Sequence, residues 1–228
     1  MPSNTAEVLL LGDSFTNIYS LHAMGWGQSA GLAEHLSAAL AQPLDVIARN
    51  SDGAFAARQI LQRELAAGRD RLSGKKVLIW EFAVRELACG DWKHIPLETA
   101  FRQDSTFYCP KPGKTARITG TLAEASPIPR PGSVPYKEHV ACLHLVDVYV
   151  DGAEQDTRME CLVFTWSIQD RQLSPAAGLH PGDRITLGVQ SWEDVAETRE
   201  KFQRSELDNV SLLAQPLLWS EGADLIRH

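Results

Sequence analysis

A serine that follows a short apolar run is the feature of this chain best suited to chemistry. Residues 7–11 are mostly apolar and lead directly into Gly12, Asp13 and Ser14. Such a run is typical of a buried parallel strand, which would present the Ser14 hydroxyl at the carboxyl edge of a sheet. A serine becomes a nucleophile when a base takes its proton and N–H donors hold the developing oxyanion. The alternative is a serine that only caps the following helix.

Each residue next to the serine in this motif has an expected role. Gly12 would permit a tight backbone, Asp13 would brace the turn by hydrogen bonding, and the Ser14 backbone N–H would serve as one oxyanion donor. Phe15 completes a Gly-Asp-Ser-Phe block that lies between a predicted strand and a predicted helix. That placement makes the block a more specific indication of a nucleophile than the tripeptide alone.

Two further loops carry polar residues directly after predicted strands. Asn50 and Gly53 follow the second strand and could supply a side-chain amide and a backbone N–H to the same oxyanion. The alternative for them is an ordinary turn. Arg85 follows the third strand and could bind an acyl oxygen or an acidic sugar. Its alternative is an ion pair with Glu86 or Glu81.

The general base is harder to place. His22 lies eight residues after Ser14, in the loop before the first predicted helix, and His94 follows the third predicted strand. Either imidazole could approach the serine and accept its proton, and the alternative for both is a solvated loop histidine. The spacing of His, Cys and carboxylate residues matches no metal motif, so we expect neither a metal nor a cofactor.

The elements that would position these residues alternate between strand and helix. Strands are predicted at residues 7–11, 44–48 and 77–80, and helices at residues 27–41 and 54–72. Three alternations predict a parallel α/β sheet with right-handed crossovers. Ligands bind beyond the carboxyl ends of such strands, so the three loops should converge on one site.

The pattern changes after about residue 103, where prolines punctuate segments rich in β-branched residues. We expect three regions: an α/β domain at 1–103, a β-rich domain at 104–192 and a helical C-terminal tail at 193–228. The β-rich domain would be a small barrel or sandwich, with an OB-like barrel as the first choice. Four strands are predicted there, at residues 116–122, 139–150, 159–168 and 184–189.

The β-rich domain could bind a ligand through aromatic and basic side chains. Four aromatic residues could form a platform on which sugars stack: Tyr108, Tyr136, Trp166 and Trp192. Five basic residues could meet an acidic polysaccharide: Arg117, Arg130, Lys137, Arg171 and Arg184. The alternative is that the aromatic residues pack in the core. An OB-like barrel also raises single-stranded nucleic acid as a weaker third hypothesis.

Composition limits the classes of partner. The 228 residues carry a formal charge of −7, which argues against a general nucleic-acid or anionic-membrane binder. The chain has no apolar stretch long enough to span a bilayer and no signal-peptide pattern at its first residues. Cys142 and Cys161 fall in neighbouring predicted strands and could form a disulfide, although free buried thiols are the expectation for all four cysteines.

The motifs together resemble a known family. Residues 11–17 (LGDSFTN), 25–27 (GWG) and 80–87 (WEFAVREL) are similar to the SGNH/GDSL-hydrolase-like domain of bacterial alginate O-acetyltransferases, the AlgX/AlgJ-related group. The resemblance covers residues 7–103. It implies a flavodoxin-like parallel sheet, here in partial form, and a periplasmic protein that works with membrane-associated acetylation machinery. Cytoplasmic localisation is the second choice.

The resemblance also implies a reaction. The family's serine attacks an acyl group from an acyl donor and passes it to a hydroxyl of a polysaccharide, acidic in the case of alginate. Ser14 occupies the serine position, and Arg85 matches more weakly. The family's Asp-x-His pair stands upstream of the serine, but none of the thirteen residues before Ser14 is a histidine. We therefore expect either a polysaccharide O-acetyltransferase or O-acetylesterase that belongs to a longer chain, or a non-catalytic carbohydrate-binding or scaffold protein with a relic core.

Overall fold

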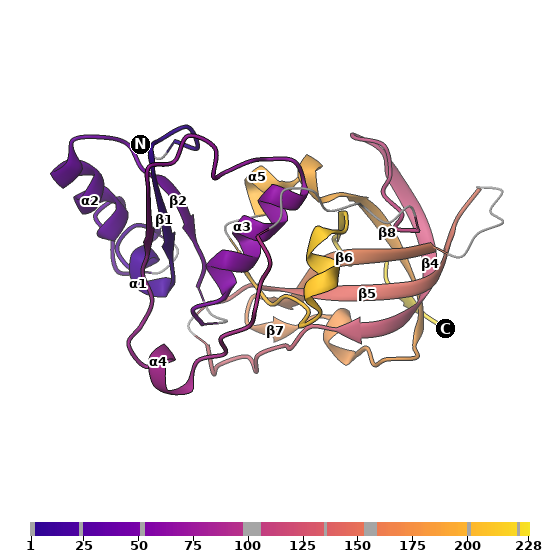
Figure 1. Ribbon diagram of the computed structural model, residues 1–228. Coiled ribbons are helices and arrows are strands. Elements are labelled where there is room, and N and C mark those ends of the chain that lie inside the picture. The colour runs from indigo at the N-terminus through magenta and orange to yellow at the C-terminus, as the bar shows by residue number, and fades with distance from the viewer. Residues whose placement is uncertain are drawn as a thin grey trace. The chain divides into compact units, whose positions relative to one another are not determined.

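The computed structural model describes residues 3–22, 25–50, 53–97, 106–134, 136–152, 159–199, 202–222 and 224–228 (Figure 1). The chain divides into two compact units, Met1–Phe101 and Arg102–His228, called here the first and second units. The first unit contains a small parallel sheet with helices. The second unit contains a β-barrel.

The sheet of the first unit has three parallel strands in the order β2-β1-β3: β1 (Val8–Gly12), β2 (Asp45–Ala48) and β3 (Val77–Trp80). All five residues of the central strand β1 are buried, because it has a neighbouring strand on each side and a helix on each face. The two outer strands are less completely buried. In particular, Val77 and Leu78 at the start of β3 remain exposed.

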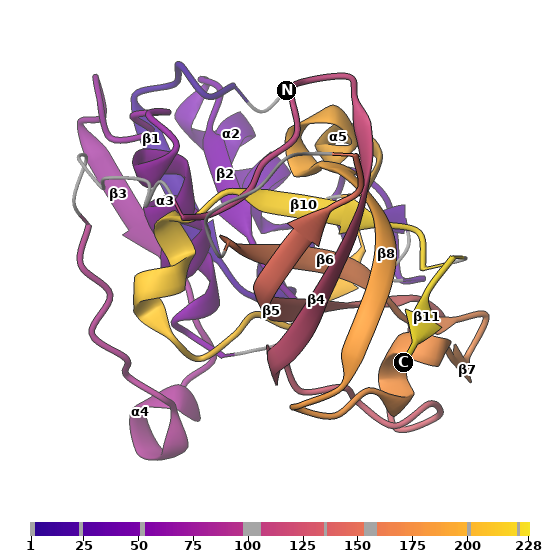
Figure 2. The ribbon, with the colours of Figure 1, turned by 90° about the vertical axis from the view of Figure 1, so that its right-hand side faces the viewer.

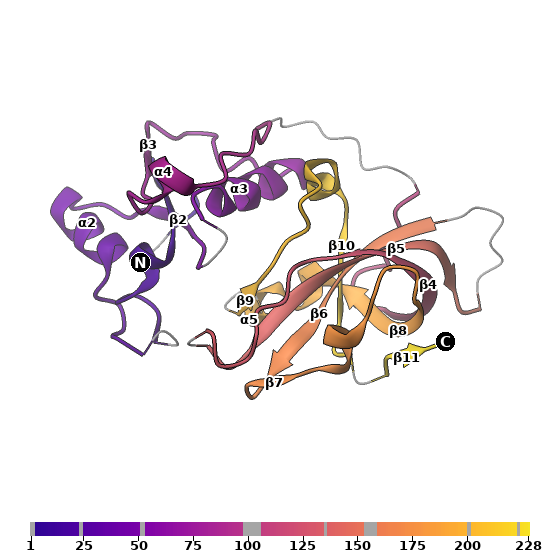
Figure 3. The ribbon, with the colours of Figure 1, turned by 90° about the horizontal axis from the view of Figure 1, so that it is seen from below.

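The two longer helices of this unit pack on opposite faces of the sheet, α2 (Leu32–Leu40) on one face and α3 (Ala56–Ala66) on the other (Figure 3). Successive strand residues point to opposite faces. Leu9 and Leu11 therefore pack against α3, whereas Val8 and Leu10 pack on the side of α2. Two short helices, α1 (Ser14–Asn17) and α4 (Glu86–Cys89), follow β1 and β3.

Both long helices are shorter than the sequence predicted. The α2 helix ends where Ala41 adopts a left-handed conformation, with φ at 51°, just before Pro43. The α3 helix ends at Ala66, and Gly68 follows with φ at +78°. The predicted extension to residue 72 fails because Arg71 lies in a turn and forms an ion pair with Asp45 at the start of β2.

The second unit is built on a closed barrel (Figure 2). Its five strands are β4 (Thr115–Ala125), β5 (His139–Val150), β6 (Met159–Gln169), β8 (Arg184–Ser191) and β10 (Leu217–Ser220). Going round the barrel the order is β4-β5-β6-β10-β8, and β8 pairs with β4 to close it. The β6–β10 pair is parallel, whereas the other four pairs are antiparallel.

Shorter elements decorate the barrel. Three two-residue strands extend its edges: β7 (Gln172–Leu173), β9 (Gln203–Arg204) and β11 (Ile226–Arg227). The connections contain one short α-helix and three 3₁₀ helices: α5 (Ala196–Arg199), η2 (Pro175–Gly178), η3 (Trp192–Asp194) and η4 (Val210–Ala214). Residues 193–228, expected as a helical tail, thus include the barrel strand β10.

The barrel buries two apolar layers. Its interior contains Leu143, Leu145 and Val163, while Phe164 and Trp219 lie in a second cluster that includes residues of the connection before β10. This connection therefore covers part of the outside of the barrel. The alternation of β-strand side chains produces both layers, because residues 163 and 164 point to opposite faces.

The expected fold class is wrong. The described chain is mostly β, with a closed barrel, a parallel sheet of only three strands and little helix, so it lacks an SGNH-type α/β core. The predicted strands and helices of the first unit lie where the sequence places them, but a periodic pattern does not reveal that the described chain adds no fourth strand to the sheet. The longest strands, of 11 and 12 residues, belong to the barrel. The β-barrel predicted for the second half is confirmed.

The structure also describes the cysteines and the character of the helices. All four cysteines lie in the described ranges, and none of them forms a disulfide. Cys161 points into the barrel interior and Cys142 into the outer layer, so the disulfide considered between them does not form. Across the described ranges, no helix has the length and apolar character that crossing a membrane requires.

Candidate functional site

The site begins where β1 ends. Asp13 is the N-cap of α1, and its Oδ1 accepts a hydrogen bond from the Phe15 backbone N–H at 2.7 Å. Its Oδ2 accepts a second bond, at 3.0 Å, from the backbone N–H of Ala83 in the loop after β3. The Asp13 side chain is nearly buried. It therefore fixes the turn around Ser14 and joins that turn to a loop that is distant in sequence.

Glu81 makes the reciprocal connection. Its Oε2 accepts a bond from the Asp13 backbone N–H at 3.0 Å and a second from Thr16 Oγ1 at 2.8 Å. Gly12 permits this close packing, because a Cβ atom on it would lie 2.1 Å from Thr16 Oγ1. The turn and the β3 loop are thus joined by three hydrogen bonds between Asp13, Thr16, Glu81 and Ala83.

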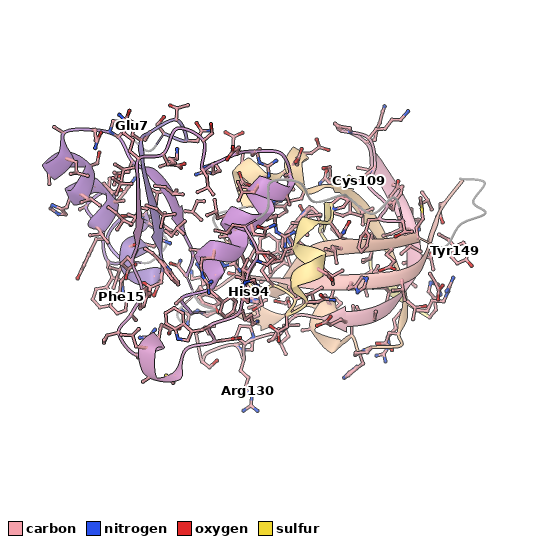
Figure 4. The ribbon with its side chains drawn as sticks, viewed as in Figure 1. Glu7, Phe15, His94, Cys109, Arg130 and Tyr149 are labelled. Carbon is pink, nitrogen blue, oxygen red and sulfur yellow. The ribbon has the colours of Figure 1, made fainter. Side chains whose placement is uncertain are left out.

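Ser14 occupies the first position of α1 and is half-buried. A backbone N–H at that position has no acceptor within its own helix, so it is available to an incoming anion. Within the part of the chain that the structure describes, no side chain is hydrogen bonded to the Ser14 hydroxyl. Phe15, the next residue, is 52% exposed and lies on the same side of the unit as α4 (Figure 4).

The loop after β2 approaches the same place. The buried Asn50 accepts a hydrogen bond at its Oδ1 from Asn17 Nδ2 of α1, at 2.9 Å. This bond holds the Oδ1 side of the Asn50 amide toward Asn17. Gly53 has φ at +73°, and a Cβ atom there would lie 2.6 Å from Glu86 Oε2. The same carboxylate oxygen accepts the backbone N–H of Ala54 at 3.0 Å.

These bonds confirm that the three loops meet at the carboxyl edge of the sheet, as the alternation of elements predicted. The first loop contacts the second through Asn17 and Asn50, and the third through Asp13 and Glu81. The second contacts the third through Glu86. Ser14 lies within this network, and the bonds around it set the backbone positions of its neighbours.

Arg85 lies at the rim of a shallow groove beside the serine turn. Its side chain is 65% exposed, and its nearest ionic partner is Glu86, 3.7 Å from Nε to Oε1. The long distance and the exposure make this a weak pair. The groove has a volume of about 440 Å³ and is lined by Phe15, Glu81, Phe82, Ala83, Val84 and Arg85.

The two candidate bases are not paired with the serine. His22 and His94 are both exposed, and neither is hydrogen bonded to Ser14 in the described structure. The segment of His94 is anchored close to the third loop, because Trp92 Nε1 donates to the Glu86 carbonyl oxygen at 2.8 Å. The ring of Trp92 also packs edge-on against Trp80, with 5.5 Å between the ring centroids.

Several residues that shape this site were missed from the sequence. The sequence suggests Glu81 only as a partner of Arg85 and gives no role to Asn17 or Trp92. A carboxylate directly after a strand end was the only available signal for Glu81. No local pattern could have indicated Asn17, because its partner is 33 residues away.

Two of the four aromatic residues considered for a sugar platform in the second unit pack into its apolar layer instead. Trp166 is only 5% exposed and packs edge-on against Trp219 and Phe202. Trp192 likewise contacts Phe164 edge-on, with 5.0 Å between the ring centroids. These rings belong to the outer apolar layer of the barrel, which is the packing alternative. Sequence could not separate the two cases, because aromatic residues suit both.

The basic residues near these rings were also missed. The guanidinium group of Arg199 lies over both Trp166 and Trp219, and that of Arg204 lies over Phe164 and Trp192. Arg199 Nη2 also donates to Glu221 Oε1 at 2.6 Å. Their stacking holds the connection before β10 on the barrel, which is a structural role.

Among the described residues, no group of three His, Cys, Asp or Glu side chains is arranged to hold a metal ion. No protein-family model, curated protein or solved structure matches the chain. The site that the geometry of the three loops defines is a serine in a braced turn with a groove beside it.

Proposed function

We propose that Ser14 is the nucleophile of an acyl-ester reaction, as in a serine esterase or O-acyltransferase. One observation carries the proposal: the Ser14 hydroxyl has no hydrogen-bond partner in the described residues, although the turn that bears it is fixed by Asp13 and Glu81. A turn held this firmly around an available hydroxyl resembles the preorganisation that covalent catalysis requires.

The proposed reaction has two steps. The Ser14 Oγ attacks the carbonyl carbon of an ester, and its proton passes to an imidazole, for which His22 and His94 are the candidates. The tetrahedral intermediate then collapses, the ester C–O bond breaks, and the leaving alkoxide takes the proton. The acyl group remains on Ser14 until water or an acceptor hydroxyl, deprotonated by the same imidazole, attacks it and releases the serine.

Oxyanion stabilisation would come from three donors. The position of the Ser14 backbone N–H at the start of α1 supports its role as the first donor. The hydrogen bond from Asn17, which orients the Asn50 amide, supports the role of that amide as the second donor. Gly53 offers a backbone N–H in the loop that Glu86 holds. Each such donor contributes about 10²- to 10³-fold to the rate in serine hydrolases.

The natural acceptor is proposed from the resemblance of the motifs rather than from the site. It would be a polysaccharide hydroxyl, with an external acyl donor and a periplasmic location. Arg85, exposed at the rim of the groove, is the residue placed to contact an acidic sugar.

Hydrolysis of p-nitrophenyl acetate tests the proposal, with Ser14→Ala as the negative control. We expect Ser14-dependent release of nitrophenolate and Ser14-dependent labelling by a fluorophosphonate. Substitution of His22 or His94 by Ala should lower kcat by about 10²- to 10⁴-fold for whichever histidine is the base. Equal hydrolysis and labelling by the protein and its Ser14→Ala variant would disprove the nucleophile.

A second candidate function is non-catalytic binding of carbohydrate. A groove of about 460 Å³ on the outside of the barrel offers a place, with polar side chains from Arg117, Gln190, Glu221 and Asp224 in its lining. Polysaccharide binding that survives Ser14→Ala but is lost in Gln190→Ala would support this function over the first.

A further inference from the structure

The groove beside Ser14 is apolar along most of its lining. Phe15, Phe82, Ala83 and Val84 contribute four of its six residues. Val84 is 79% exposed, an unusual degree of exposure for a valine in a loop braced by Asp13. The exposed ring of Phe15 directly follows the serine in sequence, so this apolar surface begins next to the proposed nucleophile.

Neighbouring residues extend the apolar surface. Leu87 of α4 is 66% exposed, and Trp92, which packs against Phe82, is 43% exposed. Exposed apolar residues that gather around one loop mark a binding surface more often than scattered ones do. Their position at the carboxyl edge of the sheet is also where ligands bind in open parallel sheets.

The charges near the groove disfavour an anionic acyl group. Two carboxylates, Asp13 in the serine turn and Glu81 in the loop after β3, are held by backbone N–H groups and a hydroxyl. A third, Glu86, lies 3.7 Å from Arg85, the one cation in the groove lining. An acyl chain that carried its own carboxylate would therefore meet net negative charge.

We propose that this groove binds an uncharged apolar acyl chain longer than acetyl, contributed by the ester that Ser14 attacks. The inference rests on the proposed function of Ser14 and names its substrate class. The chain would lie against Phe15, Phe82 and Val84 with its carbonyl carbon at the Ser14 hydroxyl. Acetyl, which the sequence resemblance implies, would leave this apolar surface uncovered.

A chain-length series provides the test. The kcat/KM values for p-nitrophenyl acetate, butyrate and hexanoate are compared after subtraction of the Ser14→Ala background. A fully buried methylene is worth about fourfold. Because the groove is shallow, we expect hexanoate to exceed acetate by at least about tenfold. A preference for acetate would overturn the inference while leaving the proposed function intact, whereas Ser14-independent turnover of every ester would overturn both.

Substitutions of two exposed valines test whether the preference for the longer acyl chain arises in this groove. Val84→Asp should lower the hexanoate-to-acetate ratio of kcat/KM about tenfold, because it places a charge against the chain. Val77→Asp, at the other end of β3 and 48% exposed, should leave the ratio unchanged. Val84→Thr keeps the side-chain shape and should also lower the ratio. Because this variant is unlike the aspartate in adding no charge, it shows that the effect does not come from misfolding. Equal ratios in all of these proteins would overturn the inference.

Discussion

The carboxylates of Asp13 and Glu81 each accept a hydrogen bond from a backbone N–H in the other residue's loop. The Asp13 backbone N–H donates to the Glu81 carboxylate at 3.0 Å, and the Asp13 carboxylate accepts the N–H of Ala83, two residues beyond Glu81. The residues are 68 positions apart, yet each carboxylate is bonded to the backbone of the other's segment. This reciprocity places the serine turn and the groove at fixed positions relative to each other within the first unit.

Removal of the Glu81 carboxylate should loosen the serine turn. Glu81→Ala leaves the Asp13 N–H and the Thr16 hydroxyl without their acceptor, which should cost about 1–3 kcal/mol of unfolding free energy. Fluorophosphonate labelling of Ser14 should slow at the same time. Glu81→Gln, which keeps an acceptor oxygen, should restore most of both quantities in urea titrations and labelling assays.

Glu7→Ala is the matched control for that experiment. Glu7 belongs to the same unit, but its ion pair with Lys76 is exposed on both sides. Such pairs contribute little to stability. An equal loss of stability and labelling in Glu7→Ala and Glu81→Ala would contradict the specific role of Glu81.

Gly12 should tolerate no side chain. Gly12→Ala would place a Cβ atom 2.1 Å from Thr16 Oγ1 and 2.6 Å from Thr16 Cβ, so the turn must shift. We expect a loss of about 1–3 kcal/mol, measured by urea denaturation. At Gly178 a Cβ atom would meet nothing within 4 Å, so Gly178→Ala should leave stability nearly unchanged. Unchanged stability in Gly12→Ala would show that the turn is not tightly packed.

Acid should weaken the outer layer of the barrel through Glu221. Burial alone would raise the pKa of Glu221, but bonds from the indole N–H groups of Trp219 and Trp166 and from Arg199 lower it below the ordinary 4.5. Because the folded-state pKa is lowered, the stabilisation is present above pH 4.5 and is lost as the pH falls through the folded-state value. Urea denaturation followed by tryptophan fluorescence should show this loss.

The Glu221→Gln variant distinguishes the contribution of Glu221 to the pH dependence of stability from that of the other acidic residues. The variant should be less stable than the parent protein at neutral pH, and the difference should shrink as the pH falls below 4.5. A difference in unfolding free energy that stays constant from pH 7 to acid would contradict the assignment of the pH dependence to Glu221.

The four thiols should differ in reactivity. Burial is the main cause that raises the pKa of Cys161, and Cys142 is equally inaccessible. Burial also raises the pKa of Cys109, although this residue is exposed. Native alkylation by iodoacetamide at pH 8, read by mass spectrometry, should modify Cys89 first, Cys109 more slowly, and the other two only after unfolding. Early modification of Cys161 would contradict the closed barrel interior.

Residue types and spacing were sufficient for the local elements of this protein. The apolar run before Gly12 predicted β1, the leucines of residues 32–40 predicted α2, and the valine-rich stretch from His139 predicted β5. These predictions succeeded because side-chain periodicity reports which face of a single element is buried. The convergence of the three loops followed from parallel strands alone.

The tertiary structure decided what joins these elements. In the described residues the parallel sheet has three strands, and the barrel closes through the β6–β10 and β4–β8 pairs; both arrangements depend on long-range hydrogen bonds. The same is true of the Asp13–Glu81 bond and of the burial of Trp166. Periodicity within one segment carries no information about which distant segment completes its hydrogen bonds or covers its apolar face, so only folding in three dimensions determines them.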